Sequence, residues 1–171
     1  MATTCKLIAK VSLGSTTSSM SFGDIPSTYD DLFLCVSVRT DRAYSSDGIK
    51  LRFNGASNDA NLSYREIQGN GSSAYSQSST TFFQSGIASG STATSNTFGS
   101  NEIYIPNYAG STNKSISGFG CSETNGTEAY LTAFAGLWSN TNAITSITIL
   151  PLIGSNFSAN SSAFLYGIKK A

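Results

Sequence analysis

The sequence contains no histidine, few cysteines and prolines, and an unusually small share of charged residues. The lack of histidine excludes Ser-His-Asp and Cys-His nucleophilic catalysis, because both use an imidazole as the general base. The three cysteines lie far apart along the chain and do not have the spacing of a zinc site. No glycine-rich phosphate loop is present, since Gly69-Asn70-Gly71 lacks the residues that would have to follow. The sequence therefore predicts no catalytic constellation, no cofactor and no metal site.

Charge is scarce as well as balanced. Charged residues make up 12% of the chain, and ten basic residues offset ten acidic ones. Because the arginines and lysines are scattered, they form no basic face for phosphates, and we expect no nucleic-acid partner. No apolar run approaches the ~20 residues that a membrane-spanning helix requires, so we expect no membrane insertion.

The N-terminal stretch MATTCKLIAKVSLG lacks the apolar core of a signal peptide and has the alternation of a strand. This predicts synthesis and folding in a cytosol. In such a reducing compartment, Cys5, Cys35 and Cys121 are expected to be free and to act as small buried hydrophobes on strands.

What the chain does contain is hydroxyl groups and strand-like alternation. Ser and Thr together make up roughly 28% of the residues, far above ordinary usage. Apolar residues alternate with polar ones in Ile49–Phe53 and Ala163–Ile168, and Leu32–Val38 is apolar on both faces. About nine or ten such segments, separated by turns and without helical periodicity, predict an all-β fold. We expect one domain over residues 1–171, an antiparallel β-sandwich of the jelly-roll kind.

Thr127–Ile153 is the longest stretch of strand character. Apolar residues recur on both sides of the polar turn Ser139-Asn140-Thr141-Asn142, a pattern that predicts a long hairpin. We expect it to share the core with Leu32–Val38, and expect both segments in sheet interiors.

Two segments are harder to interpret. Asn61–Gln68 has strand spacing at Leu62 and Tyr64, whereas its Arg65-Glu66 pair would suit a helical turn; strand is the favoured interpretation. Residues 69–101 are rich in Gly, Ser and Thr but contain a few large apolar side chains. The composition predicts a long surface excursion pinned by a short strand near Phe82.

Acidic residues offer two weak chemical options. Pairs of carboxylates can hydrolyse glycosidic bonds, and Asp30–Asp31, Asp41–Asp47 and Glu123–Glu128 lie close in sequence. The loop carboxylates of Asp41 and Asp47 could also suit a calcium ion. We favour solvated turn acids for all six.

Aromatic residues in or near loops are the better candidates for binding, because their faces beside Asn, Ser and Thr suit sugar rings or another protein chain. For Trp138 the favoured interpretation is a cap on the end of the core, and for the tyrosines packing and contact both stay open. The candidate contact residues are Tyr44, Tyr75, Tyr104, Tyr108, Trp138 and Asn140.

Several segments resemble a family of small virion proteins of marine and cyanobacterial tailed phages. The segments are TYDDLFLCVSVRTDR (Thr28–Arg42), IKLRFNG (Ile49–Gly55), YIPNYAGSTNKSIS (Tyr104–Ser117), AGLWSNTNAITSITI (Ala135–Ile149) and FLYGIK (Phe164–Lys169). The resemblance implies a non-enzymatic structural protein displayed on the particle, either as a head decoration or as a tail-fibre part.

From this resemblance we expect a protein of the virion, made in the host cytoplasm, whose partners are other capsid or tail proteins. Virion components usually sit on symmetry axes or bind symmetric partners, so we expect a homo-oligomer, for which a homotrimer is the guess, or another symmetric multi-copy assembly. The expected role is a capsid decoration or knob. The alternative is a tail-fibre or receptor-binding domain that recognises host surface glycan through its loop aromatics, and a glycan hydrolase is the most distant third option.

Overall fold

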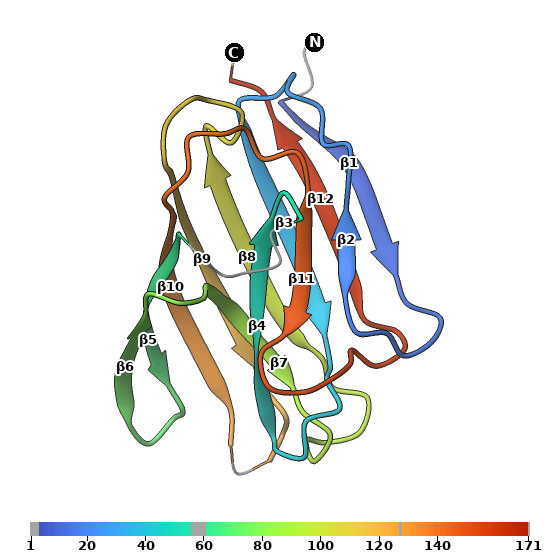
Figure 1. The fold of residues 1–171 in the computed structure, drawn as a ribbon. Coiled ribbons are helices and arrows are strands. Elements are labelled where there is room, and N and C mark those ends of the chain that lie inside the picture. The colour runs from blue at the N-terminus through green and yellow to red at the C-terminus, as the bar shows by residue number, and fades with distance from the viewer. Residues whose placement is uncertain (1–3, 56–60, 127, 171) are drawn as a thin grey trace.

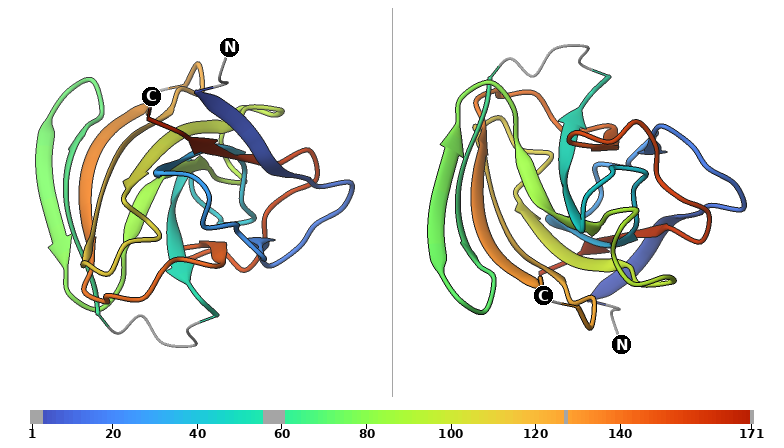
Figure 2. Two further views of the ribbon diagram at one scale, coloured as in Figure 1. Left: turned by 90° about the horizontal axis from the view of Figure 1, so that it is seen from above. Right: turned by 90° about the horizontal axis from the view of Figure 1, so that it is seen from below.

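The computed structural model describes residues 4–55, 61–126 and 128–170 of the chain. In these residues, twelve strands form an eight-stranded and a four-stranded sheet (Figure 1). Within each sheet, neighbouring strands pair antiparallel throughout. The larger sheet curves around the smaller one, as the end-on views show (Figure 2). The predicted antiparallel β-sandwich of jelly-roll kind is therefore confirmed, with more strands than the nine or ten expected.

The strands follow one another across each sheet in an order far from their order in sequence. The larger sheet contains, edge to edge, β1 (Cys5–Ser12), β12 (Ser162–Ile168), β3 (Asp31–Val38), β8 (Gly99–Pro106), β9 (Lys114–Ser122), β10 (Tyr130–Trp138), β5 (Leu62–Gly69) and β6 (Ala74–Ser79). The smaller sheet contains β2 (Met20–Phe22), β11 (Ile147–Pro151), β4 (Ser46–Phe53) and β7 (Gln84–Ser89).

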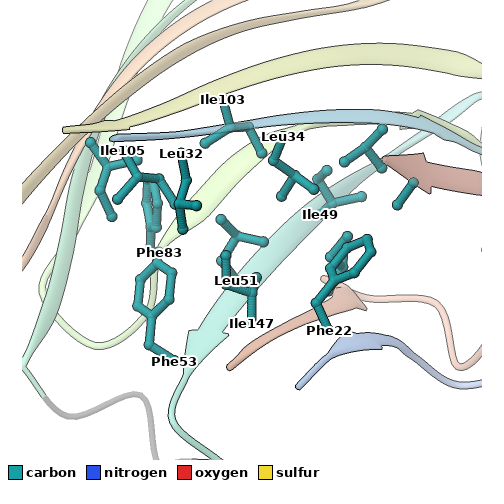
Figure 3. Close-up of a cluster of buried hydrophobic side chains, with 14 of the residues drawn as sticks. Phe22, Leu32, Leu34, Ile49, Leu51, Phe53, Phe83, Ile103, Ile105 and Ile147 are labelled. Atoms are coloured by element: carbon teal, nitrogen blue, oxygen red, sulfur yellow. The ribbon is translucent and has the colours of Figure 1, made fainter. Parts of the chain in front are cut away.

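The core lies between the two sheets, and strand alternation decides which residues enter it. In β9, for example, every second residue from Lys114 to Ser122 is buried, and the residues between are exposed. Aliphatic and aromatic side chains from both sheets interdigitate in the middle of the sandwich (Figure 3). Those labelled there are Phe22, Leu32, Leu34, Ile49, Leu51, Phe53, Phe83, Ile103, Ile105 and Ile147.

Strand β7 and the residue before it approach the larger sheet closely, because glycines stand at two points of contact, one in β7 and one in the larger sheet. Gly86 has a φ of 141°, and a Cβ there would collide with the side chain of Asn101. Gly136 of β10 leaves room for the ring of Phe83, which a Cβ at that position would overlap. Glycine at these positions is thus required by packing between the sheets.

The expected hairpin over Thr127–Ile153 is wrong, although both of its arms are strands. Strand β10 pairs with β5 and β9 in the larger sheet, whereas β11 pairs with β2 and β4 in the smaller one. Residues 139–146 therefore connect the two sheets, and Thr127 lies outside the described residues. The likeness to a hairpin arose because two core strands separated by a polar turn have the same pattern whether or not they pair.

The expected surface excursion over residues 69–101 also needs correction. Its first part does contain an exposed edge strand, β6. Its second part contains β7, of which all six residues are buried between the sheets. Four of its six residues are Ser, Gly or Ala, and Gly86 is required by its close approach to Asn101 of β8; this small and polar composition resembles that of a loop.

Two smaller expectations concern strand faces. Strand β3 is an interior strand, as predicted, but its outward residues Phe33 and Cys35 are only half-buried, because no layer built from the described residues covers the outer face of the larger sheet. Cys5 and Cys121 are exposed, so the expectation of buried cysteines fails for both. All three thiols are free.

Candidate functional site: a polar cleft and an apolar face

A polar cleft of about 360 Å³ opens at the margin where the β5–β6 hairpin stands beside the edge of the smaller sheet. It is lined by residues of the loop before β4, of β4, β5, β6 and β7, of the start of β10 and of the segment after β11. The loop contributes Arg42 and Tyr44. The strands contribute Gln68, Tyr75 and Gln84, which face the cleft. A cleft of this size can hold a sugar ring.

One wall of the cleft contains the phenols of Tyr44 and Tyr130, which are hydrogen-bonded to the carboxylate of Glu128, a residue outside the lining. Tyr44 donates from its hydroxyl to Oε1 of Glu128 at 3.5 Å, and Tyr130 donates to Oε2 at 3.2 Å. Ser45 donates a further hydrogen bond to Oε2. The Arg42 guanidinium lies 5.0 Å above the Tyr44 ring, a cation–π contact that fixes this side chain. Burial raises the pKa of Tyr130, and the charge of Glu128 raises it further, so this phenol stays a hydrogen-bond donor at neutral pH.

Amide side chains form the floor, those of Gln68, Gln77 and Gln84, and a buried acid outside the lining is hydrogen-bonded to two of them. Glu66 is only 2% exposed, and it accepts hydrogen bonds from Nε2 of Gln77 at 2.7 Å and from Nε2 of Gln84 at 3.0 Å. Burial raises the pKa of Glu66, against the lowering effect of these two amides. Tyr75 donates its hydroxyl to Gln68. The floor therefore presents a set of fixed polar groups with mixed donor and acceptor character.

The structure places only two of the six predicted contact residues in this cleft, Tyr44 and Tyr75. Tyr108 is 0% exposed and donates its hydroxyl to the carbonyl of Pro26, so it is a core residue. Trp138 is 4% exposed, and its ring centroid lies 5.3 Å from that of Phe53. The favoured interpretation of Trp138 as a core cap is therefore confirmed.

The other two predicted residues lie elsewhere. Tyr104 is half-buried on the outer face of the larger sheet and donates to Oδ2 of Asp31 at 2.5 Å. Asn140 accepts the N–H of Asn142 on its Oδ1 at 2.8 Å and forms part of the connection between the sheets. Neither faces the cleft.

Sequence reasoning missed the polar strand residues of the site. The inward positions of β5 are Tyr64, Glu66 and Gln68, all buried, whereas Ile67 points outward and is 66% exposed. This reversal of the usual pattern was the signal. It also explains why Asn61–Gln68 was ambiguous as a strand.

The interpretation of the paired acids as solvated turn acids is wrong for Asp31 and Asp47, which are each 1% exposed. In the loop next to the cleft, Asp41 and Asp47 accept hydrogen bonds from backbone N–H groups. Asp41 accepts the N–H groups of Ser155 and Asn156 at 2.8 and 3.0 Å. Asp47 accepts those of Ile153 and Gly154 at 3.2 and 2.9 Å. Their carboxylate oxygens are engaged in positioning the loop after β11, the place where we considered calcium. In the described part of the chain, no three His, Cys, Asp or Glu side chains gather closely enough for a metal.

A second feature lies on the outer side of the larger sheet, which no layer covers in the part of the chain that the structure describes. Outward side chains of β5, β9 and β10 make a contiguous patch with a groove of about 560 Å³, which we name the apolar face. It consists of Ile67, Phe119, Leu131, Ala133, Ala135 and Leu137. Ile67, Phe119 and Leu131 are 66%, 63% and 64% exposed. Exposed apolar patches of this kind mark interaction surfaces.

Comparison with known proteins adds little. No protein-family model and no curated protein matches the sequence. Among solved structures, galectin LEC-6 of Caenorhabditis elegans is similar at a TM-score of 0.36 and 13% identity, over 91% of this chain and 98% of the galectin. A likeness at this level carries no argument about fold or ligand. Among the described residues, no helix is long and apolar enough to cross a membrane.

Proposed function

We propose that the protein is a non-enzymatic structural component of a phage particle, displayed on its surface as a head decoration or knob. The apolar face is the observation that carries this proposal. It exposes four large hydrophobic side chains, those of Ile67, Phe119, Leu131 and Leu137, on a chain whose formal net charge is zero. Such a surface favours contact with another protein, because burying it removes apolar area from water without stripping charges. The resemblance to phage virion proteins supplies the setting.

A particle-bound role also makes a modest interface sufficient. A protein present in many copies on a regular lattice gains avidity from neighbouring contacts, so each contact can be weak. The protein is synthesised in the host cytoplasm and its partners are then the capsid or tail proteins. It requires no cofactor for this role.

Localisation on purified particles tests the proposal. Mass spectrometry gives the copy number, and antibody labelling under the electron microscope gives the position. We expect many copies over the shell. A few copies at the tail would indicate a role in host recognition and not in head decoration. Absence from the particles would refute a virion role altogether.

Incorporation of variants tests the part played by the apolar face. Phe119→Ser should reduce incorporation into particles, since it removes the central aromatic ring of the face. Leu7→Ser is the matched control, because Leu7 is also exposed, at 43%, but lies on β1 at the opposite edge of the same sheet. Equal incorporation of both variants would contradict attachment through this face.

The second candidate function is recognition of host surface glycan by a tail-fibre or receptor-binding domain, and the polar cleft favours it. Fixed amides, phenols and a carboxylate beside aromatic rings are the groups that bind the hydroxyls and apolar faces of sugars. Tyr44 and Tyr75, both exposed, stand at its opening.

Titration with host polysaccharide, followed by NMR of the isolated protein, tests this second function. Binding should shift signals of Gln68 and Gln84 and should be lost in Tyr75→Ala. It should survive in Tyr166→Ala, which removes a half-buried tyrosine of β12 outside the cleft. No shift at millimolar sugar would count against glycan recognition, and release of sugar fragments on prolonged incubation would show a hydrolase instead.

A further inference from the structure

The strand register places large and small side chains of the apolar face in a regular pattern. Strands β9 and β10 lie side by side at its centre, and their outward residues pair directly across the ladder. No pair contains two large side chains: three pairs join a large residue to a small one, and one pair joins two small residues. The pairs are Cys121 with Leu131, Phe119 with Ala133, Ser117 with Ala135, and Ser115 with Leu137.

This pattern is self-complementary under one symmetry operation. A two-fold axis that runs between β9 and β10, parallel to the strands and above the face, stacks β9 of one copy on β10 of the other. Each residue then lies opposite the residue that it pairs with in its own sheet. Phe119 of each copy therefore lies over Ala133 of the other, and Leu131 lies over Cys121. No two large side chains lie directly opposite each other on these two strands, and the Phe119 side chains of the two copies lie next to each other across the axis.

We propose that the apolar face binds a second copy of this chain in this arrangement, forming a two-fold dimer through the outer faces of the larger sheets. The inference rests on the proposed role of the face in assembly, and it names the occupant. A two-fold contact uses the same patch on both copies, so self-complementarity is the property that it demands. The large-and-small alternation meets that demand row by row.

Charges at the margins of the face agree with the same operation. Strand β8 lies beside β9 and carries Glu102 and Tyr104 outward, whereas β5 lies beside β10 and carries Arg65. The two-fold axis stacks β8 of one copy on β5 of the other. By register, Arg65 then lies opposite Tyr104 of the second copy and one row from Glu102, and Glu102 itself lies opposite Ile67. A cation thus meets an aromatic ring and a carboxylate, twice in each dimer.

The area of the face limits the strength of the dimer. Four strands spaced about 4.8 Å apart, and four rows spaced about 6.7 Å apart, give about 500 Å² of flat sheet per copy. Curvature of the larger sheet keeps the outer strands apart, so contact is confined to this central part (Figure 2). About 1,000 Å² in total is at the small end of stable interfaces, and we expect a dissociation constant in the micromolar range.

Sedimentation equilibrium of the isolated protein at about 1 to 500 µM tests the dimer over the range that this interface size implies. We expect a concentration-dependent monomer–dimer equilibrium. Phe119→Ser should raise the dissociation constant about tenfold or more, because it empties both central contacts. Ala133→Phe should do the same by filling the space that Phe119 of the second copy occupies. Leu7→Ser should leave the equilibrium unchanged.

Cross-linking tests the geometry with the natural thiols. The Cys121 residues of the two copies lie on either side of the axis, in sheets about 10 Å apart, within reach of a short bis-maleimide. Cross-linked dimer should form with the unaltered chain and with Cys5→Ser, and should disappear with Cys121→Ser. Cys5 is the matched control because it is exposed on β1 of the same sheet.

Two outcomes would overturn the inference. One is a monomer over the whole concentration range. The other is a dimer that persists unchanged in Phe119→Ser and Ala133→Phe. If the protein is monomeric in solution while Phe119→Ser still abolishes incorporation into particles, the face binds a different virion protein. That result would overturn the dimer and leave the proposed function in place.

Discussion

The side-chain amide of Asn101 is hydrogen-bonded on both sides to the backbone of Ile87. Its Oδ1 accepts the Ile87 N–H at 2.7 Å, and its Nδ2 donates to the Ile87 carbonyl at 2.9 Å. Asn101 belongs to β8 of the larger sheet and Ile87 to β7 of the smaller one. A single buried side-chain amide therefore makes the two hydrogen bonds that a neighbouring strand would otherwise make to Ile87. It joins the two sheets beside Gly86, where they approach closely.

Removal of this amide should destabilise the protein strongly. In Asn101→Ala, the N–H and carbonyl of Ile87 lose their partners while they stay buried, which costs about 3 kcal/mol of unfolding free energy. Urea unfolding followed by circular dichroism measures the change. Asn113→Ala, at an exposed position between β8 and β9, should change the free energy of unfolding by less than about 0.5 kcal/mol.

Asn101→Asp separates the role of the donor from that of side-chain volume. A carboxylate of almost the same shape still accepts from the Ile87 N–H but cannot donate to its carbonyl. We expect a loss of stability at neutral pH at least as large as that of Asn101→Ala, because the charge is buried as well. A stability near that of the unaltered protein would contradict the assigned role.

Asp31 should make the free energy of unfolding depend on pH in the acidic range. This carboxylate is 1% exposed and accepts from Tyr104, from the N–H of Asn107 and from Nζ of Lys170. Burial acts to raise its pKa, but these hydrogen bonds and the Lys170 charge outweigh burial and hold the pKa below 3.8. A lowered folded-state pKa stabilises the fold above the unfolded value of 3.8, and this stabilisation is lost as the pH falls through the folded-state pKa.

Asp31→Asn should therefore lower the unfolding free energy at pH 7, and the difference from the unaltered protein should shrink below pH 3.8. Unfolding curves in urea at a series of pH values give the comparison. Asp24→Asn serves as the control, because Asp24 is exposed and its φ of 52° suits asparagine equally well. A difference that stays constant from pH 7 to pH 2 would contradict the assignment. The same contact raises the pKa of Tyr104 to about 12.

Much of the fold could be predicted because alternation reports directly on burial. Leu32–Val38, Ile49–Phe53 and Ala163–Ile168 are strands within a few residues of the expected bounds. Which strands pair with each other could not be predicted in the same way, because strand pairing depends on residues far away in sequence. The arms around Ser139–Asn142 form strands of different sheets, and nothing in their own composition distinguishes that from a hairpin.

The candidate site was harder to predict for a related reason. Tyr108 and Trp138 lie next to turns, where aromatic rings are commonly exposed, yet both rings turn into the core. Gln68 and Gln84 lie in strands and point into the cleft, although a polar residue in a strand is normally assigned to the solvent side. Only the tertiary structure shows that the inner face of β5 extends past the edge of the smaller sheet.

Trp138 offers a spectroscopic check of its buried position. It is the single tryptophan of the chain, and Lys114 Nζ lies 5.8 Å from its ring centroid. Its fluorescence should be blue-shifted in the folded protein and poorly quenched by acrylamide, and it should not respond to sugars that bind in the cleft. Trp138→Ala should cost about 4 kcal/mol through the cavity it leaves. Ready quenching by acrylamide in the folded state would contradict the buried position.

Glu66 should make stability depend on pH in the opposite sense to Asp31. Burial raises its pKa above 4.5, against the lowering effect of Gln77 and Gln84. A raised folded-state pKa contributes stability that is fully present below 4.5 and is lost as the pH rises through the folded-state value. Glu66→Gln has no such titration. Its unfolding free energy relative to the unaltered protein should therefore increase from pH 4 towards pH 8.

Urea unfolding of both proteins across this range measures the difference, and the carboxyl carbon of Glu66 can be followed by NMR through the same range. Glu102→Gln is the matched control, because Glu102 is an exposed residue on the outer face of the same sheet. Its difference from the unaltered protein should not follow the Glu66 titration. If the Glu66→Gln difference is flat with pH, the carboxyl group carries its charge in the fold as easily as in water. The acid that holds Gln77 and Gln84 at the floor of the cleft would then be solvated, and glycan recognition through a rigid floor would lose its physical basis.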